Sequence, residues 1–72
     1  MKKYKIETLD VNEMSNEVFT NDYKEALKIQ AELKEYAKTN NLTLVVSLYE
    51  EWMGKYTLLE SDTMNPTKII KL

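Results

Sequence analysis

The sequence predicts a small α+β domain in which one amphipathic helix packs on one face of a four-stranded antiparallel sheet, in the order ββαββ. Three observations carry this prediction. Apolar residues recur at helical spacing over residues 22–40, they alternate with polar ones over 3–9 and 42–50, and the chain's only glycine follows Met53 between two strand-like segments. Because 72 residues leave room for one core, we expect a single domain over residues 1–72.

Residues 3–9 have the period-two pattern of a half-buried strand. The apolar parity of this segment is formed by Tyr4, Ile6 and Thr8. Leu9 and Val11 then carry apolar character on the opposite parity. This break in phase predicts either a β-bulge near Asp10 or a change of exposure.

A polar, turn-rich segment over 12–16 precedes a short β-prone stretch over 17–20. We therefore expect the two stretches to form the first antiparallel hairpin. Phe19 lies just ahead of the expected helix, so we expect it to pack back on the first helical turns. Three further aromatic side chains are expected in the core or at its rim, namely Tyr4, Tyr23 and Tyr36.

The helix is expected over about 22–40. Asp22 with Glu25 three residues later resembles a capping box, and the pair Asn40 and Asn41 suits a helix exit because Asn tolerates left-handed backbone. Charged side chains occupy one face of the helical projection. The other face carries Tyr23, Ala26, Leu27, Ile29, Leu33, Tyr36 and Ala37.

The strongest strand pattern covers residues 42–50. A two-residue turn at Met53 and Gly54 would return the chain along residues 55–60, since Gly readily adopts positive φ. That turn predicts four cross-strand pairs: Trp52 with Lys55, Glu51 with Tyr56, Tyr49 with Leu58 and Leu48 with Leu59. Residues 61–72 are expected to form a tail, interrupted by Pro66, in which Ile70 and Leu72 form a short edge strand or pack across the core.

The two periodicities also predict which side chains share the core. Leu42, Leu44, Val46 and Leu48 fall on one side of their strand, which is expected to face the helix. The side chains expected to be buried together are Leu27, Leu33, Leu44, Val46 and Leu48.

The composition argues against catalysis. The chain has no Cys, no His and no Arg, and its single Gly cannot build a phosphate-binding loop. The acidic pairs Glu50 with Glu51 and Glu60 with Asp62 are expected to be solvated charges at a strand edge. We therefore expect no enzyme, no cofactor and no metal site.

The sequence shows no targeting segment and no stretch of apolar residues long enough to cross a bilayer. A cytoplasmic protein without a membrane partner is expected.

One side of the second hairpin is left over once the helix covers the other. Large apolar side chains occur on both parities of these strands, and one helix covers one face only. An uncovered apolar and aromatic face often binds a partner. The residues proposed for such a partner surface are Val45, Tyr49, Trp52, Tyr56 and Leu58, flanked by Glu50 and Glu51.

Three alternatives remain for this surface. Ile69, Ile70 and Leu72 could fold over it, a second copy could cover it in a homodimer, or a foreign protein could bind it. Flanking carboxylates favour a partner with a basic surface. Trp52, beside the turn, is expected to fold its indole back over the end of the sheet.

The chain is rich in Lys, Glu, Asn and Tyr and lacks Cys. In composition and layout it resembles the small orphan proteins carried by phages and mobile elements, which often bind a host or defence protein, including as inhibitors of CRISPR nucleases. The resemblance implies a non-catalytic interaction module, an inhibitor or regulator.

A single-stranded nucleic-acid-binding module is the alternative, because aromatic side chains on an open sheet can stack bases. Its basic residues would be Lys2, Lys3, Lys5, Lys68 and Lys71. The formal net charge of −2 and the missing Arg make a nucleic-acid partner the less favoured expectation.

Overall fold

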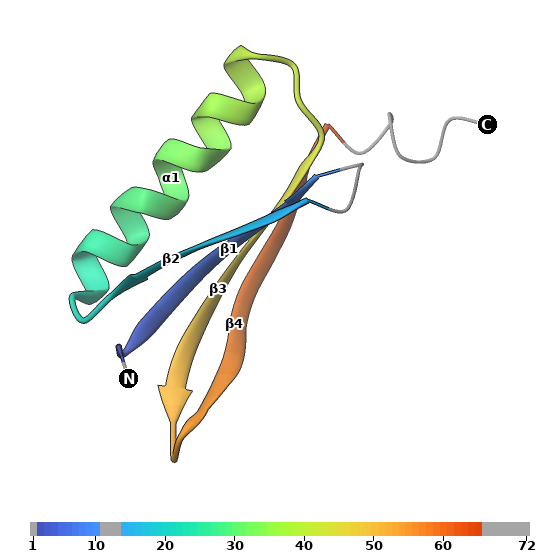
Figure 1. The fold of residues 1–72 in the computed structure, drawn as a ribbon. Coiled ribbons are helices and arrows are strands. Elements are labelled where there is room, and N and C mark those ends of the chain that lie inside the picture. The colour runs from blue at the N-terminus through green and yellow to red at the C-terminus, as the bar shows by residue number, and fades with distance from the viewer. Residues whose placement is uncertain (1, 11–13, 66–72) are drawn as a thin grey trace.

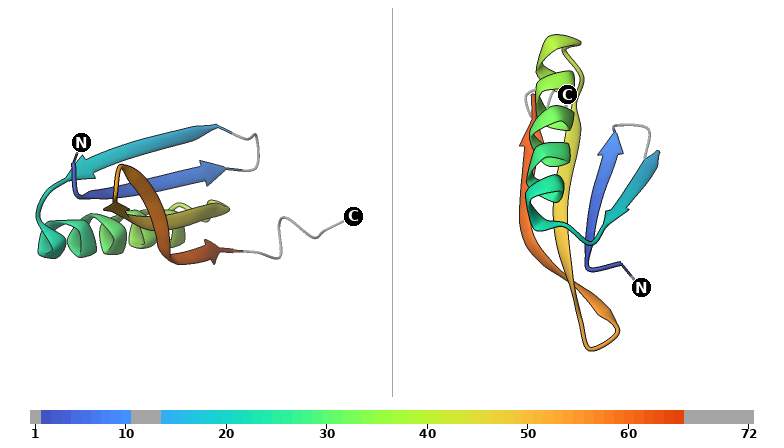
Figure 2. Two further views of the ribbon diagram at one scale, coloured as in Figure 1. Left: turned by 90° about the horizontal axis from the view of Figure 1, so that it is seen from below. Right: turned by 90° about the vertical axis from the view of Figure 1, so that its left-hand side faces the viewer.

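The computed structural model describes residues 2–10 and 14–65. Within them the elements follow the order β1 (Tyr4–Asp10), β2 (Ser15–Thr20), α1 (Tyr23–Thr39), β3 (Leu44–Trp52) and β4 (Lys55–Met64). The strands form one antiparallel sheet in the order β2-β1-β3-β4, and α1 packs against one face of it (Figure 1). Figure 2 shows the same two layers from below and from the side. The predicted ββαββ fold is confirmed.

The first hairpin has a regular register. Pairs run from Tyr4 opposite Thr20 to Leu9 opposite Ser15. No register shift interrupts β1 along its pairs with β2 or β3, so within the described residues the expected bulge near Asp10 is absent. The alternative expectation, a change of exposure, applies to Leu9. Its side chain lies on the sheet face away from the helix and is 40% exposed. Val11 lies outside the described residues.

Local capping chemistry fixes both ends of α1, as predicted. The Asp22 carboxylate accepts a hydrogen bond from the Lys24 backbone N–H at 2.9 Å. At the other end Asn41 adopts a left-handed φ of 54°, and the Leu42 N–H donates to the Ala37 carbonyl at 2.8 Å. Glu25 departs from the expected capping box, because its carboxylate accepts from the Thr20 hydroxyl at 2.5 Å.

The second hairpin turns at Met53 and Gly54, as predicted, and Tyr49 faces Leu58. The predicted pair of Leu48 with Leu59 is wrong, because a register shift between Leu48 and Tyr49 places Leu48 opposite Glu60. Leu59 is therefore the extra residue of a β-bulge.

β4 continues to Met64, so residues 61–64 belong to the sheet and not to a tail. The strand expected around Ile70 and Leu72 lies outside the described residues.

The core lies between α1 and the two central strands. Four fully buried apolar side chains form one cluster there, namely Ile6, Ala26, Val46 and Leu48, and Ala37 is fully buried as well. Partly buried Tyr4, Ile29, Leu33, Leu44 and Met64 pack against them.

The prediction that Leu27 joins this core is wrong, since it is 40% exposed. The buried positions of α1 are Ala26, Gln30 and Ala37. Leu27 follows Ala26 by one residue, which turns it about 100° around the helix axis and away from the sheet.

A candidate protein-interaction face on the open side of the sheet

Strand pairing defines which side chains lie on the sheet face opposite α1, called here the open face. Residues directly opposite each other in an antiparallel pair share a face, and neighbours along a strand alternate. Because Leu48 points into the core, Tyr49 and its partners Lys5 and Leu58 point the other way. The same reasoning places on the open face Lys5, Glu7, Leu9, Ser15, Glu17, Phe19, Val45, Ser47, Tyr49, Glu51, Tyr56, Leu58, Ser61 and Thr63.

Three aromatic rings gather around one lysine on this face. The Lys5 Nζ lies 4.3 Å from the ring centroid of Tyr49 and 5.1 Å from that of Tyr56. The rings of Phe19 and Tyr56 approach to 5.9 Å between centroids. We call Phe19, Tyr49 and Tyr56 the aromatic cluster. Cation–π attraction of this kind contributes roughly 0.5–2 kcal/mol per contact.

Polar contacts fix the periphery of the aromatic cluster. The Lys5 ammonium pairs with Glu17 at 3.4 Å, and the Lys5 side chain is only 16% exposed. The Tyr49 hydroxyl donates to Glu7 Oε1 at 3.2 Å, and the Tyr56 hydroxyl donates to the Lys2 carbonyl at 2.8 Å. Burial, followed by the hydrogen bond to Glu7, raises the pKa of Tyr49 above 10.0. The rings of Tyr49 and Tyr56 are thus held in place at both their faces and their hydroxyls.

The open face is acidic. Glu7, Glu17 and Glu51 lie on it, and Lys5 is the one cation that strand pairing places there among the described residues. Glu51 Oε2 also accepts a hydrogen bond from the Gly54 N–H at 2.7 Å, which braces the β3–β4 turn. The face therefore carries excess negative charge around an aromatic centre.

The structure brings together five of the seven residues predicted for the partner surface. The five that share the open face are Val45, Tyr49, Glu51, Tyr56 and Leu58. The other two, Glu50 and Trp52, lie on the helix-facing parity. Glu50 is opposite Tyr4 and pairs with Lys3 at 3.7 Å. Trp52 is 65% exposed, so the expectation that its indole folds back over the sheet is wrong.

Sequence reasoning missed Phe19 and Lys5. Phe19 was expected against the first turns of α1, but its neighbour Val18 is the residue that faces the helix side, opposite Ile6. Phe19 therefore points to the open face. The sequence did contain a signal for this. Side chains alternate between the two faces along residues 17–20, so placing Val18 with Ile6 on the core side puts Phe19 on the other side. Lys5 carried no local signal, because its contacts come from three other strands.

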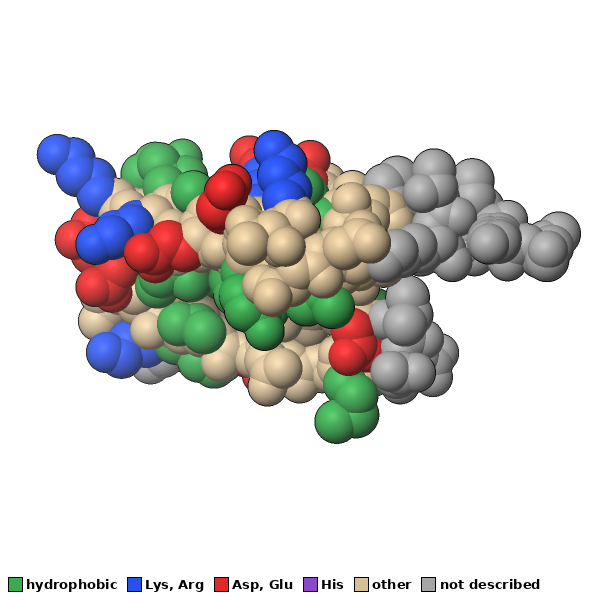
Figure 3. All heavy atoms as spheres, turned by 90° about the horizontal axis from the view of Figure 1, so that it is seen from above, with side chains coloured by type: hydrophobic (Ala, Val, Ile, Leu, Met, Phe, Trp, Pro, Cys, Tyr) green, Lys and Arg blue, Asp and Glu red, His purple; other side chains and the backbone are tan. Residues whose placement is uncertain are grey.

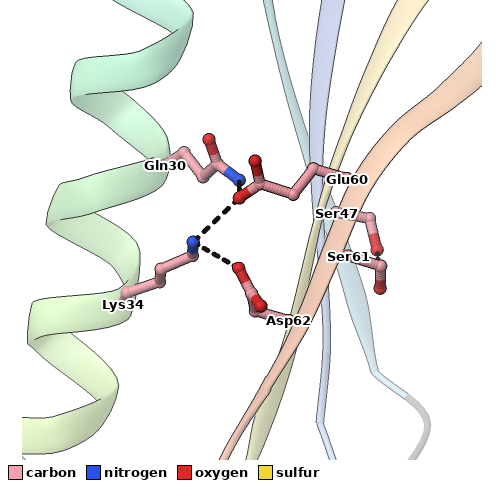
Figure 4. A network of polar contacts seen from close by, with 6 residues as sticks. All are labelled: Gln30, Lys34, Ser47, Glu60, Ser61 and Asp62. Atoms are coloured by element: carbon pink, nitrogen blue, oxygen red, sulfur yellow. Dashed lines mark hydrogen bonds and ion pairs between the residues drawn. The ribbon is translucent and has the colours of Figure 1, made fainter.

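A polar network joins α1 to β4 on the opposite face (Figure 4). The buried Gln30 amide donates to Glu60 Oε1 at 2.8 Å. The Lys34 ammonium donates to the same oxygen at 3.1 Å and to Asp62 Oδ2 at 2.5 Å.

This network corrects the expectation that Glu60 and Asp62 are merely solvated. Hydrogen bonding and charge from Lys34 lower the pKa of Asp62, and the hydrogen bond to Asp62 raises the pKa of Lys34. Figure 4 also shows Ser47 and Ser61 on the other side of the strands, where their hydroxyls lie 3.1 Å apart.

A second apolar surface lies on the flank between α1 and the edge strand β2. The Thr20 hydroxyl bonds Glu25, so the side of α1 that carries Glu25 and, eleven residues later, Tyr36 faces β2. Val18 and Tyr36 are both exposed there. Figure 3 shows hydrophobic side chains along the middle of the molecule seen from above, with charged ones around them. On the helix side of the sheet the rings of Tyr4 and Tyr23 approach to 5.3 Å between centroids, so what distinguishes the open face is the contact of Lys5 with two tyrosine rings.

Among the residues that the structure describes, no three carboxylates gather closely enough to hold a metal ion. In the same part of the chain, no helix has the length and hydrophobicity to span a membrane.

The chain matches no family model, and neither the curated proteins nor the solved structures contain a significant match to it.

Proposed function

We propose that this protein acts without catalysis, by covering a basic surface of another protein with the open face of its sheet. The aromatic cluster is the observation that carries the proposal. Tyr and Phe rings with fixed orientation lose little conformational entropy on binding, and Tyr is enriched where interfaces gain most of their affinity. On the described part of the chain the only helix lies on the other face. The cluster is thus available to a partner.

The acidic rim specifies the chemistry of the partner. Three carboxylates against one ammonium attract a protein surface that carries Lys or Arg, and they raise the rate of association. A host or defence protein with a nucleic-acid-binding groove has such a surface. The resemblance in composition to phage and mobile-element proteins supports an inhibitor or regulator that works in the cytoplasm.

The same charges weigh against the two competing occupants. A single-stranded nucleic acid would bring its phosphates towards Glu7, Glu17 and Glu51, while the face's own Lys5 is already paired with Glu17. A second copy stacked on the open face would oppose like charges. Both arrangements are disfavoured electrostatically.

Geometry also keeps residues 66–72 from reaching Tyr56, the member of the aromatic cluster nearest the β3–β4 turn. The Asn65 amide donates to the Leu42 carbonyl at 2.6 Å, which ties the end of β4 to the helix exit. Tyr56 lies about 30 Å back along the strand from that point. Residues 66–72 span only about 25 Å when fully extended.

Affinity compared with stability tests the proposal. The full chain is immobilised, a partner is captured from host lysate with and without nuclease, and the dissociation constant of the purified pair is measured. Tyr49→Ala and Tyr56→Ala should each weaken binding by about tenfold or more. Lys24→Ala and Lys28→Ala, on the outer side of α1, should leave it unchanged. Melting temperatures identify any variant that simply unfolds.

Two results would overturn the proposal. Capture that disappears on nuclease treatment would favour the single-stranded nucleic-acid module. Loss of binding in a helix-face lysine variant, with the tyrosine variants still bound, would move the interface to α1.

A further inference from the structure

The β3–β4 turn projects beyond the rest of the sheet (Figures 1 and 2). Near the turn this hairpin is tied to the residues that precede β1: the Glu51 N–H donates to the Lys3 carbonyl at 2.7 Å, and the Tyr56 hydroxyl donates to the Lys2 carbonyl at 2.8 Å. Beyond these contacts Trp52 pairs only with Lys55. We call residues 52–55 the hairpin tip.

Met53 has an unusual backbone conformation for its residue type. Its φ is +51° and that of Gly54 is +83°, the combination of a two-residue type I′ turn. Such turns favour Asn, Asp or Gly at the first position, because a longer side chain clashes with the backbone at positive φ. The other described non-glycine residues with positive φ are both asparagines, Asn41 and Asn65. Met53 thus occupies a position that Asn would fit better.

Met53 is also 84% exposed, and its neighbour Trp52 is 65% exposed. A large apolar side chain in water and a strained backbone therefore coincide at one residue, and neither contributes to the core. The tip is nevertheless well braced, because the Glu51 carboxylate accepts from the Gly54 N–H. Violations of local preference of this kind concentrate at functional sites.

We propose that the hairpin tip inserts Trp52 and Met53 into an apolar pocket of the partner protein, beside the surface that the open face covers. This inference rests on the proposed function. A narrow projection with two apolar side chains fits a concave site and not a flat one. Met adapts to irregular pockets, and Trp is the residue most enriched among strong interface contacts.

The charges behind the tip identify a protein pocket, as opposed to a lipid surface. The tip adjoins the open face, whose carboxylates Glu7, Glu17 and Glu51 outnumber its one cation, and anionic headgroups would be repelled by that face. Glu50 is paired with Lys3 at 3.7 Å, so a pocket whose rim carries Lys or Arg complements Glu51, in line with the basic surface expected for the open face.

Met53→Asn separates binding from folding. Asn relieves the strain at positive φ and removes apolar exposure, so the melting temperature should rise by a few degrees. Partner affinity should fall by about tenfold or more, because the contact in the pocket is lost. Met14→Asn is the matched control, since Met14 is another methionine, 66% exposed, at the far end of the sheet. It should leave affinity unchanged.

Site-specific crosslinking reads out the contact before the partner is identified. A photo-reactive amino acid at Lys55 of the full chain should form a protein adduct in host lysate, whereas the same group at Met14 should not. Excess wild-type protein should suppress the adduct. The Met53→Asn variant should need at least a tenfold higher concentration to suppress it to the same extent.

The competition also separates this inference from the proposed function. If Met53→Asn competes as well as wild type while Tyr56→Ala does not, the tip plays no part in binding and the partner binds the open face alone. If Tyr56→Ala competes fully while Met53→Asn does not, the tip contacts the partner and the proposed role of the open face is wrong. An equal adduct from both crosslinker positions, or none from Lys55, overturns insertion of the tip.

Discussion

Two leucines of this chain show how position decides what a side chain contributes. Leu48 is 1% exposed and sits among Ile6 and Val46, whereas Leu27 is 40% exposed on the flank of α1. Both were predicted to be core residues from their apolar character. The helix meets the sheet through its small residues, Ala26 and Ala37, which are both fully buried. Alanines allow close approach of the two layers, and leucines beside them are pushed to the rim.

The pair gives a matched test of the core. Leu48→Ala should lower the free energy of unfolding by about 2–5 kcal/mol, because it removes buried apolar area and leaves a cavity. Leu27→Ala should lower it by less than about 1 kcal/mol. Urea unfolding followed by circular dichroism measures both. Equal losses in the two variants would show that Leu27 is packed as tightly as Leu48.

At the scale of elements, segments with local signals were predictable and those set by distant contacts were not. Asp22 caps the start of α1, and Asn40 with the left-handed Asn41 ends it, through bonds to nearby residues, so sequence alone located the helix. The bulge at Leu59 has no local signal. With a regular register Leu59 would face α1 and Glu60 would face the open side. The shift reverses this and brings Glu60 and Asp62 to Lys34, a residue of another element.

The residues of the candidate site divide in the same way, into those with a local signal in the sequence and those placed by distant contacts. Tyr49, Tyr56 and Leu58 were placed together from one hairpin, whose turn was visible at Gly54. Phe19 and Lys5 come from the other hairpin, and their approach to Tyr56 depends on the sheet order β2-β1-β3-β4. The order of strands in a sheet was not predicted from sequence here, so these two residues could not be assigned to the site.

The link between α1 and β4 predicts how stability depends on pH. The pKa of Asp62 lies below its ordinary value of 3.8 in the folded protein. Its contribution to stability is therefore complete above that value and is lost as pH falls through the lower, folded pKa. Melting temperatures between pH 5 and pH 2 should fall less steeply for Asp62→Asn than for wild type.

Glu32→Gln, on the exposed side of α1, is the control and should follow the wild-type curve. An unchanged slope in Asp62→Asn would mean that the ion pair with Lys34 does not persist in solution. At the alkaline end Lys34, whose pKa is raised above 10.5, gives the opposite sign: its contribution is lost as pH rises through the folded value.

At the scale of the whole molecule, one helix on a four-stranded sheet leaves the two halves of the fold unequally protected. β1 and β3 are central strands that carry the buried Ile6, Val46 and Leu48, whereas β2 and β4 are edges. The described part of the chain thus has a core on one side of the sheet and an exposed, organised face on the other.

Amide hydrogen exchange should reproduce this asymmetry. Hydrogen-bonded amides of β1 and β3 should exchange slowest, because they open only with the core. Those of β2 should exchange faster, since its residues are exposed except for Thr20. Protection of β2 equal to that of β1 would indicate that something covers the edge strand in solution.

The hydrogen bonds at the two ends of the described chain determine how the protein can be handled in the laboratory. The Lys2 carbonyl accepts from the Tyr56 hydroxyl, so a bulky group fused at the amino terminus begins beside the aromatic cluster. Asn65 is fastened to the helix exit through the Leu42 carbonyl, at the opposite end of β4. A purification tag or sensor-chip linker placed after residue 65 therefore leaves the aromatic cluster and the hairpin tip pointing away from the support. The same attachment at the amino terminus would hide the surface that the binding assay is meant to measure.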